Sequence, residues 1–451
     1  MNALLLNRAL GVISPPAFQR HETTRLLHAL QSTPVRFDGS AQADGDALPE
    51  EVKAHAAGVN AMTIDKFEGR YLLSGGADSS ICMWDLESRE EGSVDTVYPL
   101  GTLPKTSKAH RFGVTHVSFY PFDSLAFLCS SYDHTLKIYS SETLQLSASF
   151  DLNHVVYSHS MSSIASHLLV ACATQQPTVR LVDLRSGAAT HSLAGHAGAV
   201  LSTAWSPTTE HIVASGGADG TVRFWDIRRS AGCLGLLDKE DSIGVAGLDG
   251  LGGSSARNNR QQGRAHGGAV NGVVWTEDGR HVVTAGHDER VRVWDTATGA
   301  NTLASFGPAV KNAHLSALLP LVSPPALTAP GKECLFYPSE REILVYELFD
   351  GRLLRRLKAP HCATGTVGAA GNQKQLKNRT TALAWRAHDV EVYSAHADGT
   401  IRAWAPRTEE DVMADDEERQ EAEHEEQTRK RKREALEEIY RDFTKKQMIF
   451  N

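Results

Sequence analysis

Short apolar stretches alternate with turn residues along most of the chain, and the pattern repeats. One unit contains apolar segments at 59–64, 71–74 and 80–84, in which apolar and polar or small residues alternate. Segments of this length and period are typical of β-strands. Between the second and third segments, residues 75–78 (Gly-Gly-Ala-Asp) supply the glycine and aspartate that a tight turn requires. The pattern therefore predicts neighbouring strands joined by short turns.

The unit recurs at fixed internal spacing, which indicates a repeat architecture. A His opens the three clearest copies and a fourth, weaker one, and the central apolar residue of the next strand follows it by nine residues in all four. The turn Asp follows the same His by 23 residues in three copies and by 22 in the remaining one. The opening histidines are His55, His110, His196 and His266, and the turn aspartates are Asp78, Asp133, Asp219 and Asp288. Repeats of this kind stack into one continuous body.

Counting the units gives seven. Two weaker copies run from 155 to 183 and from about 315 to 348, and the last copy runs from 380 to 404; a fourth, outer strand is expected after each unit. Seven blades close a ring well. We predict an all-β fold, a seven-bladed β-propeller over residues 34–405. A helical arm at 1–33, which follows from the pattern around Pro15 and Pro16, and a charged helical tail at 406–451 complete the predicted organisation.

Composition narrows the function classes. The 451 residues are 41% hydrophobic and 22% charged, with a net charge of −8, as expected for a soluble folded protein that is not built as a general polyanion binder. The six cysteines are scattered and have no metal-ligand spacing, which indicates neither a disulfide framework nor a zinc site. No apolar run reaches transmembrane length. We predict no metal, no cofactor and no membrane partner.

The recurring His, Ser or Thr, Asp and Trp residues could be mistaken for hydrolase triads. A hydrolase needs one triad beside one oxyanion hole, whereas this set recurs in blade after blade. We interpret it as structural: the Trp indole donates to the hydroxyl, the hydroxyl to His, and the other His nitrogen to Asp. We therefore predict no catalytic residues; a propeller enzyme would instead need convergent acids or metal ligands in its central channel. The network residues are His55, Ser74, Asp78, Trp84, His196, Ser215, Asp219, Trp225, His266, Thr284, Asp288 and Trp294.

The His opening, the turn Asp and the Trp-Asp close resemble the family of WD-repeat propellers, over about residues 55–405. The resemblance implies a rigid, non-catalytic platform for protein–protein interaction. A generic scaffold in signalling or chromatin is one function that fits this expectation.

Two consecutive units carry a finer resemblance. Val182-Asp183-Leu184-Arg185 and Trp225-Asp226-Ile227-Arg228 resemble the W-D-x-R motif of cullin-4 ubiquitin ligase receptors, in which paired motifs face the damaged-DNA-binding adaptor. The resemblance implies that Asp183, Arg185, Asp226 and Arg228 contact this adaptor. The alternative is that each Asp-x-Arg forms an ordinary surface salt bridge.

Nearly the whole chain to about residue 405 is similar to the Cockayne syndrome group A family, in segments 5–8, 22–25, 68–76, 156–159 and 225–229. This similarity implies a nuclear substrate-recognition subunit of a cullin-4 RING ubiquitin ligase that acts in transcription-coupled nucleotide excision repair. The Cockayne syndrome group B ATPase and RNA polymerase II would be its clients, and Leu5, Leu6 and Arg8 would bind the adaptor. The basic run at 429–433 departs from the family pattern; it is either a nuclear-import or nucleic-acid patch or a solvated helix face, which leaves direct DNA contact open.

Overall fold

The computed structural model describes residues 2–39, 52–88, 96–106, 109–229, 232–241, 263–340, 342–358, 379–386, 390–407 and 413. The chain forms two compact units, residues 1–405 and residues 406–451. The first unit contains both the helical arm and the propeller. The predicted charged tail lies outside the described residues except for 406, 407 and 413, and the basic run at 429–433 lies wholly outside them.

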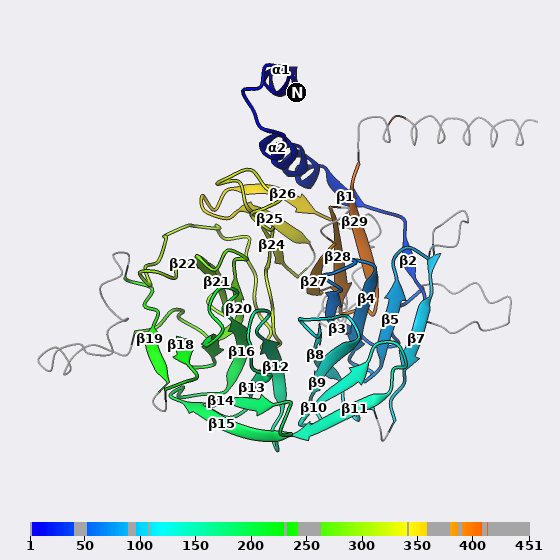
Figure 1. Ribbon diagram of the computed structural model, residues 1–451, viewed down its shortest axis with the longest axis vertical. Coiled ribbons are helices and arrows are strands. Elements are labelled where there is room, and N and C mark those ends of the chain that lie inside the picture. The colour runs from blue at the N-terminus through cyan, green and yellow to red at the C-terminus, as the bar shows by residue number, and fades with distance from the viewer. Residues whose placement is uncertain are drawn as a thin grey trace, which may run out of the picture. The chain divides into compact units, whose positions relative to one another are not determined.

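Seven antiparallel sheets lie around a common centre, which confirms the predicted seven-bladed propeller (Figure 1). The first blade contains β3 (Val59–Ile64), β4 (Tyr71–Gly76), β5 (Ile81–Asp85) and β7 (Pro99–Leu103). The second contains β8 (Val114–Phe119), β9 (Ala126–Ser131), β10 (Thr135–Ser140) and β11 (Leu146–Asp151). The third contains β12 (Val156–Met161), β13 (Leu169–Thr174), β14 (Thr178–Asp183) and β15 (Ala188–Ala194). The fourth contains β16 (Val200–Trp205), β17 (Ile212–Gly217), β18 (Val222–Asp226) and β19 (Cys233–Leu236).

The remaining blades depart from the simple repeat. The fifth contains β20 (Val270–Trp275), β21 (His281–Gly286) and β22 (Arg290–Asp295). The sixth contains β23 (Leu321–Val322), β24 (Cys334–Pro338), β25 (Ile343–Glu347) and β26 (Leu353–Leu357). The seventh contains β27 (Thr380–Arg386), β28 (Glu391–His396), β29 (Ile401–Pro406) and, as its outer strand, β1 (Leu30–Ser32). A small parallel pair, β2 (Arg36–Phe37) with β6 (Thr96–Val97), adds to the first blade's side of the ring.

The outer strand of the seventh blade comes from the N-terminal end of the chain. The sequence pattern placed residues 30–32 at the end of the arm, but β1 pairs with β29. This pairing covers an edge strand that would otherwise present unpaired backbone groups. The two ends of the ring are therefore joined within one sheet.

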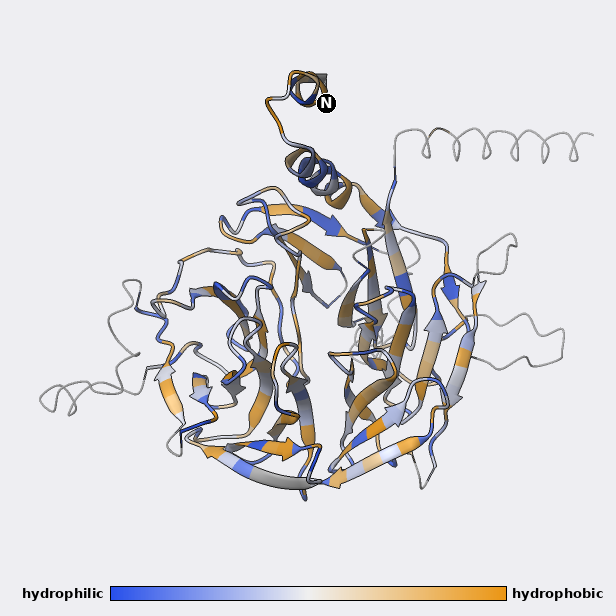
Figure 2. Cartoon of the chain, viewed as in Figure 1, coloured by the Kyte–Doolittle hydropathy of each residue, from blue (hydrophilic) through white to orange (hydrophobic). Residues whose placement is uncertain are grey.

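Apolar residues of neighbouring blades pack face to face and form the core. Figure 2 shows that hydrophobic residues are concentrated on the strands. Leu73 and Met83 of the first blade, for example, pack with Val114 and Phe127 of the second. The largest fully buried side chains are the four repeat tryptophans, Trp84, Trp225, Trp294 and Trp404.

The innermost strand of six blades carries a β-bulge at its second residue. A bulge re-aims the side chain that it carries. Four of these side chains donate hydrogen bonds to backbone carbonyls beyond their own blade; Asn60 Nδ2, for instance, donates to Val114 O at 2.8 Å. The bulge residues are Asn60, Thr115, Tyr157, Leu201, Asn271 and Thr381. The four that donate, Asn60, Thr115, Asn271 and Thr381, link their blades to the neighbouring segments around the ring's centre.

Two helices form the arm, α1 (Asn2–Ala9) and α2 (Pro15–His28). Ser14 is the N-cap of α2, and prolines occupy its first two positions, where a missing N–H costs no helix hydrogen bond. No helix among the described residues is long and apolar enough to cross a membrane.

Candidate functional site

The fourth blade contains a complete polar network. Trp225 Nε1 donates to Ser215 Oγ at 2.7 Å, and His196 Nε2 lies 2.7 Å from the same oxygen. The other imidazole nitrogen, His196 Nδ1, lies 3.3 Å from both carboxylate oxygens of Asp219 and 3.0 Å from the hydroxyl of Thr221. The hydroxyl of Ser215 is fully buried, so a substrate carbonyl has no access to it. The Ser, His and Asp therefore form a buried structural hydrogen-bond network.

The first and fifth blades repeat the network with small changes. Trp84 donates to Ser74 at 2.8 Å and His55 Nε2 lies 2.7 Å from Ser74 Oγ, but His55 Nδ1 lies 3.6 Å from Asp78 because the Ser80 hydroxyl sits between them, 2.6 Å from each. In the fifth blade the corresponding distances are 2.9 Å for Trp294 to Thr284, 2.7 Å for His266 Nε2 to Thr284, and 2.8 Å for His266 Nδ1 to Asp288.

The sequence interpretation missed the hydroxyl that lies two residues after the turn Asp. Each of these hydroxyls donates to the carboxylate two residues before it, at 2.6 to 2.8 Å. A hydroxyl at this fixed offset is a signal that the sequence did carry. The residues are Ser80, Thr135, Thr221 and Thr400.

Two blades substitute other groups in the network. In the second blade Tyr139 replaces Trp, and Ser130 bonds to His159 Nδ1 of the third blade at 3.0 Å. Consequently His110 Nε2 is buried with no hydrogen-bond partner among the residues that the structure describes, although His110 Nδ1 lies 2.9 Å from Asp133. In the seventh blade the histidine comes from the end of the second strand: His396 Nε2 lies 2.9 Å from Ser394, which accepts from Trp404 at 2.8 Å.

The turn aspartates are held as carboxylates. Burial alone would raise the pKa of Asp219, but hydrogen bonds from His196, from the N–H groups of Ala197 and Thr221 and from the Thr221 hydroxyl outweigh it and hold the pKa well below its usual range. Hydrogen bonds also lower the pKa values of Asp78, Asp133 and Asp288, although Asp288 accepts from Arg292 in place of a turn hydroxyl. These carboxylates therefore lock turns and histidine orientation. Among the described residues there is no group of three or more His, Cys, Asp or Glu side chains that could hold a metal ion.

The two Asp-x-Arg pairs differ in geometry. Arg228 grips the buried carboxylate of Asp226 with two hydrogen bonds, Nε to Oδ1 at 3.0 Å and Nη2 to Oδ2 at 2.9 Å. Asp183 accepts from the backbone N–H of Arg185, at 3.0 Å, and from Ser186. Within the described part of the chain, the exposed Arg185 guanidinium forms no ion pair. The fourth-blade pair is thus closed on itself, while the third-blade arginine is available to another molecule.

Helix α2 is fastened to the sixth and seventh blades. Leu27 packs into a cluster with Phe336 and Trp404. Thr24 Oγ1 accepts a hydrogen bond from the N–H of Ala329 at 3.0 Å, and Arg20 Nε donates to Ala326 O at 3.1 Å. These contacts fix α2 on the ring.

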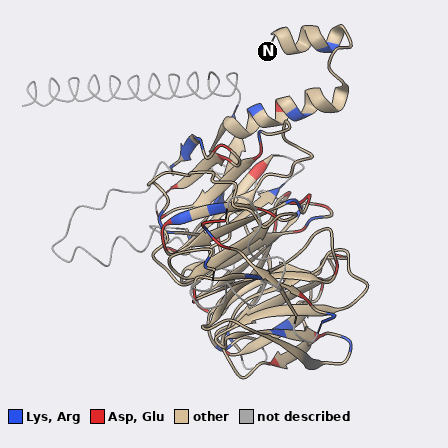
Figure 3. Ribbon diagram, turned by 90° about the vertical axis from the view of Figure 1, so that its left-hand side faces the viewer, with Lys and Arg blue, Asp and Glu red and all other residues tan. Residues whose placement is uncertain are grey.

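Helix α1, in contrast, lies farther from the ring than α2 in side view (Figure 3). The Arg8 guanidinium stacks on the ring of Phe18, 4.6 Å from its centroid, which links α1 to α2. Four apolar side chains on α1 and the turn after it remain in solvent, with exposed fractions of 48% for Leu5, 59% for Leu6, 67% for Leu10 and 72% for Val12. We call these four residues the α1 apolar patch.

The arm and the Asp-x-Arg pairs share a face of the ring but not a position around it. In a four-stranded antiparallel blade, the first and third connections leave from the same face. Helix α2 contacts the ring at the β23–β24 connection. Asp183 and Arg185 lie at the start of the β14–β15 connection, and Asp226 and Arg228 lie at the start of the β18–β19 connection. Figure 1 shows α2 beside β26 and β1, across the ring from β14, β15, β18 and β19. The structure therefore does not bring the two sets into one patch.

Comparison with known proteins agrees with this fold. The family described as "WD domain, G-beta repeat" matches residues 48–85, 101–140, 187–226 and 259–295, which correspond to the first, second, fourth and fifth blades. The WD repeat-containing protein ATCSA-1 of Arabidopsis thaliana is 30% identical over 426 residues, which cover 81% of this chain and 89% of that protein. The chain belongs to the WD-repeat family. The family match does not cover the third, sixth and seventh blades, but the structure shows a sheet at each of these positions.

Other WD-repeat relatives cover less of the chain. Ribosome biogenesis protein YTM1 of Phaeosphaeria nodorum is 26% identical over 273 residues, 54% of this chain and 55% of that protein. Its counterpart from Neurospora crassa is 28% identical over 280 residues, 54% of each chain. No catalytic family is indicated by these matches, and WD-repeat propellers typically act as non-catalytic scaffolds.

Proposed function

We propose that this WD-repeat protein is the substrate-recognition subunit of a cullin-4 RING ubiquitin ligase, bound through the damaged-DNA-binding adaptor and acting in transcription-coupled nucleotide excision repair. The near full-length similarity to ATCSA-1 supports the proposal, because it spans 89% of that protein. The Cockayne syndrome group B ATPase and RNA polymerase II are the proposed clients, and the nucleus is the proposed location.

The observation that carries the proposal is the contrast between the two arm helices. Helix α2 is packed against the ring, whereas the α1 apolar patch has no covering element among the described residues. A short helix that presents apolar side chains to solvent is suited to a hydrophobic groove on a partner. We assign Leu5 and Leu6 to the core of this contact and Arg8 to holding α1 in its orientation through Phe18.

The Asp-x-Arg pairs would contribute at a second position on the same face. Asp183 and Arg185, with Asp226 and Arg228, lie on neighbouring blades, so a large adaptor could contact both them and the arm. The free guanidinium of Arg185 can form a charged contact, whereas Asp226 keeps Arg228 in a fixed orientation. Recruitment of a client to the other face would raise its effective concentration at the ligase, with no chemistry in this chain.

A second candidate is a WD-repeat scaffold with a different partner set. The similarity to the YTM1 proteins favours it, but these matches cover about half of each chain. Such a scaffold would bind partners through the ring and would not depend on Leu5 and Leu6.

The test is co-elution with the purified damaged-DNA-binding adaptor in gel filtration, using the full chain. We expect wild type to form a complex and the double variant Leu5→Asp, Leu6→Asp to lose it, because two charges would have to enter an apolar groove. The matched control is Leu303→Asp, an exposed leucine on the outer side of the fifth blade, which should co-elute as wild type does. Failure of wild type to co-elute, or full retention by the double variant, would refute the proposal.

A further inference from the structure

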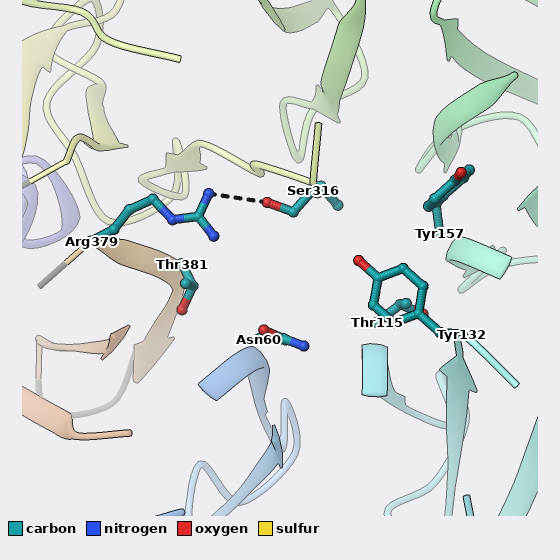
Figure 4. A pocket seen from close by; sticks show the side chains of 8 residues that line it. Asn60, Thr115, Tyr132, Tyr157, Ser316, Arg379 and Thr381 are labelled. Atoms are coloured by element: carbon teal, nitrogen blue, oxygen red, sulfur yellow. Dashed lines mark hydrogen bonds between the residues drawn. The ribbon is translucent and has the colours of Figure 1, made fainter. Parts of the chain in front are cut away.

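A polar recess opens at the centre of the ring. It is bounded by bulge residues of the inner strands, by a turn of the second blade and by the segments that lead into the sixth and seventh blades. Figure 4 shows Arg379 and Ser316 on one side and Tyr132 and Tyr157 on the other. The lining residues are Asn60, Thr115, Tyr132, Tyr157, Ser316, Ala317, Arg379 and Thr381.

The recess lies on the face opposite the arm anchor. Tyr132 belongs to the β9–β10 turn, and Ser316 and Arg379 precede the inner strands β23 and β27. Second connections and inter-blade connections leave an antiparallel blade on the face opposite its first and third connections. A ligand in the recess and an adaptor on the arm face would therefore not compete for space.

Among the described residues that line the recess, Arg379 is the only cation, and its charge is only partly satisfied. Its Nη1 donates to Ser316 Oγ at 3.3 Å, while its Nε is buried without a partner among the described residues. No carboxylate in the described part of the chain lies within 4.0 Å of its guanidinium. Burial lowers the pKa of Arg379, yet a guanidinium keeps its proton in proteins. A half-buried cation with no carboxylate in direct contact is unfavourable, so an anion in the recess would stabilise it.

The wall opposite Arg379 offers further donors. Tyr132 is 40% exposed, and Figure 4 shows its hydroxyl directed toward the space between Arg379 and Tyr157. Asn60 and Thr115, which also line the recess, are held by hydrogen bonds to neighbouring blades at 2.8 and 2.6 Å. These bonds hold this part of the recess in place, which lowers the entropic cost of binding.

We propose that this recess binds the acidic side chain of a peptide segment lying across the channel mouth, with Arg379 as the anion-binding residue. A planar guanidinium can grip a carboxylate or a phosphate with two parallel hydrogen bonds, and the hydroxyls of Tyr132 and Tyr157 would donate to the remaining oxygens. The shared chemistry is an oxyanion, which glutamate and phosphoserine both supply.

A peptide fits the recess better than a nucleic acid does. Affinity for a nucleic acid comes from several phosphate contacts, whereas the part of the recess that the structure describes is lined by one cation. The acidic Glu340 also acts electrostatically on Arg379, which disfavours a polyanion along this face. That the peptide belongs to a ligase client rests on the proposed function; the binding itself does not.

The experiment measures binding of four fluorescent peptide pools to the full chain by anisotropy. Each pool has random flanks and a fixed central residue: phosphoserine, glutamate, serine or glutamine. We expect the two acidic pools to bind at least about tenfold more tightly than their neutral counterparts, the scale of a charged hydrogen-bonded pair. The comparison between the acidic pools distinguishes phosphate from carboxylate as the source of the anion.

Three variants complete the test. Arg379→Gln should reduce binding of the acidic pools to that of the neutral pools, and Tyr132→Phe should weaken it by a smaller factor even if Arg379→Gln fails to fold. Arg290→Gln is the matched control, since Arg290 is exposed at the β21–β22 turn on the same face. Equal binding of acidic and neutral pools, unchanged binding by both recess variants, or tighter binding of a single-stranded oligonucleotide would overturn the proposal. Arg379→Gln should still co-elute with the adaptor as wild type does. This measurement distinguishes failure of the peptide-binding proposal from failure of the ligase proposal.

Discussion

The backbone N–H of Thr33 donates a hydrogen bond to the carbonyl oxygen of Ala403 at 3.0 Å, and the Thr33 hydroxyl donates to the same oxygen at 3.2 Å. These bonds join residues 370 positions apart and hold β1 on β29. The segment that carries the arm is thus also the segment that closes the ring. Removing the whole arm would open the seventh blade, so a deletion that tests docking must stop short of α2.

We predict that two deletions in the arm have different effects on stability. Deleting residues 2–13 should leave the urea midpoint unchanged, because the α1 apolar patch is exposed. Deleting residues 2–33 also removes the buried Leu27 and Leu30, each costing about 2–5 kcal/mol, and this is comparable with the whole stability of a typical domain. Equal midpoints for the two deletions would show that β1 does not close the ring.

The network of the fourth blade should stabilise the fold measurably. Ser215→Ala leaves Trp225 Nε1 and His196 Nε2 buried without a partner, so we expect a loss of about 2 kcal/mol or more in the free energy of unfolding. Thr143→Ala, at an exposed hydroxyl of the second blade, should change it by less than about 0.5 kcal/mol. Urea denaturation of the two variants makes the comparison. If Ser215→Ala is as stable as the control, the network does not stabilise the fold.

Stability should fall on mild acidification. Burial lowers the pKa of His116 to about 4 and that of His396 to about 3, and burial together with His116 lowers the pKa of His159 well below its usual value. These rings titrate near 6.5 in the unfolded chain, so the unfolded state binds more protons below that pH. Their contribution is therefore complete above about pH 6.5 and declines toward pH 4, by up to about 1.4 kcal/mol per pH unit for each ring.

Urea midpoints measured between pH 7 and pH 5 test this prediction. His116→Leu should reduce the slope, because one titrating ring is removed from the core. His134→Asn, at an exposed turn position, should keep the slope of wild type. A midpoint that stays constant over this range would contradict the prediction.

Substitution of each arginine should show that the two Asp-x-Arg pairs contribute differently to adaptor binding. Arg185→Glu should weaken adaptor binding several-fold and reduce its salt dependence, since an exposed interfacial charge acts mainly on the association rate. Arg228→Ala should have a smaller effect, because Arg228 already binds Asp226. Association rates at two salt concentrations provide the measurement, with Arg290→Glu on the opposite face as control. Unchanged rates for Arg185→Glu would favour the ordinary surface interpretation of these pairs.

The features that the sequence predicted correctly are local and repeated. The spacing of His196 and Asp219 gave the position of a blade because the distance between them is set within one repeat. Even the sixth blade, which lacks these residues, was located from its apolar strand pattern. Repetition supplied several independent estimates of each strand position.

The features that the sequence missed depend on contacts between distant segments. β1 has three residues and no alternating pattern, and its partner lies at the far end of the chain. His159 bonds to Ser130 of a neighbouring blade, which no within-repeat spacing could show. Arg379 resembles an ordinary loop residue in the sequence, and only the closed ring places it opposite Tyr132.

The location of adaptor binding is tested most directly by hydrogen–deuterium exchange of the full chain, alone and with the purified damaged-DNA-binding adaptor. We predict strong protection of residues 2–13 and weaker protection of the turns after Asp183 and Asp226, with unchanged exchange at residues 315–317 on the opposite face. Protection confined to the opposite face, with residues 2–13 exchanging as in the free protein, would contradict the proposed mode of adaptor binding.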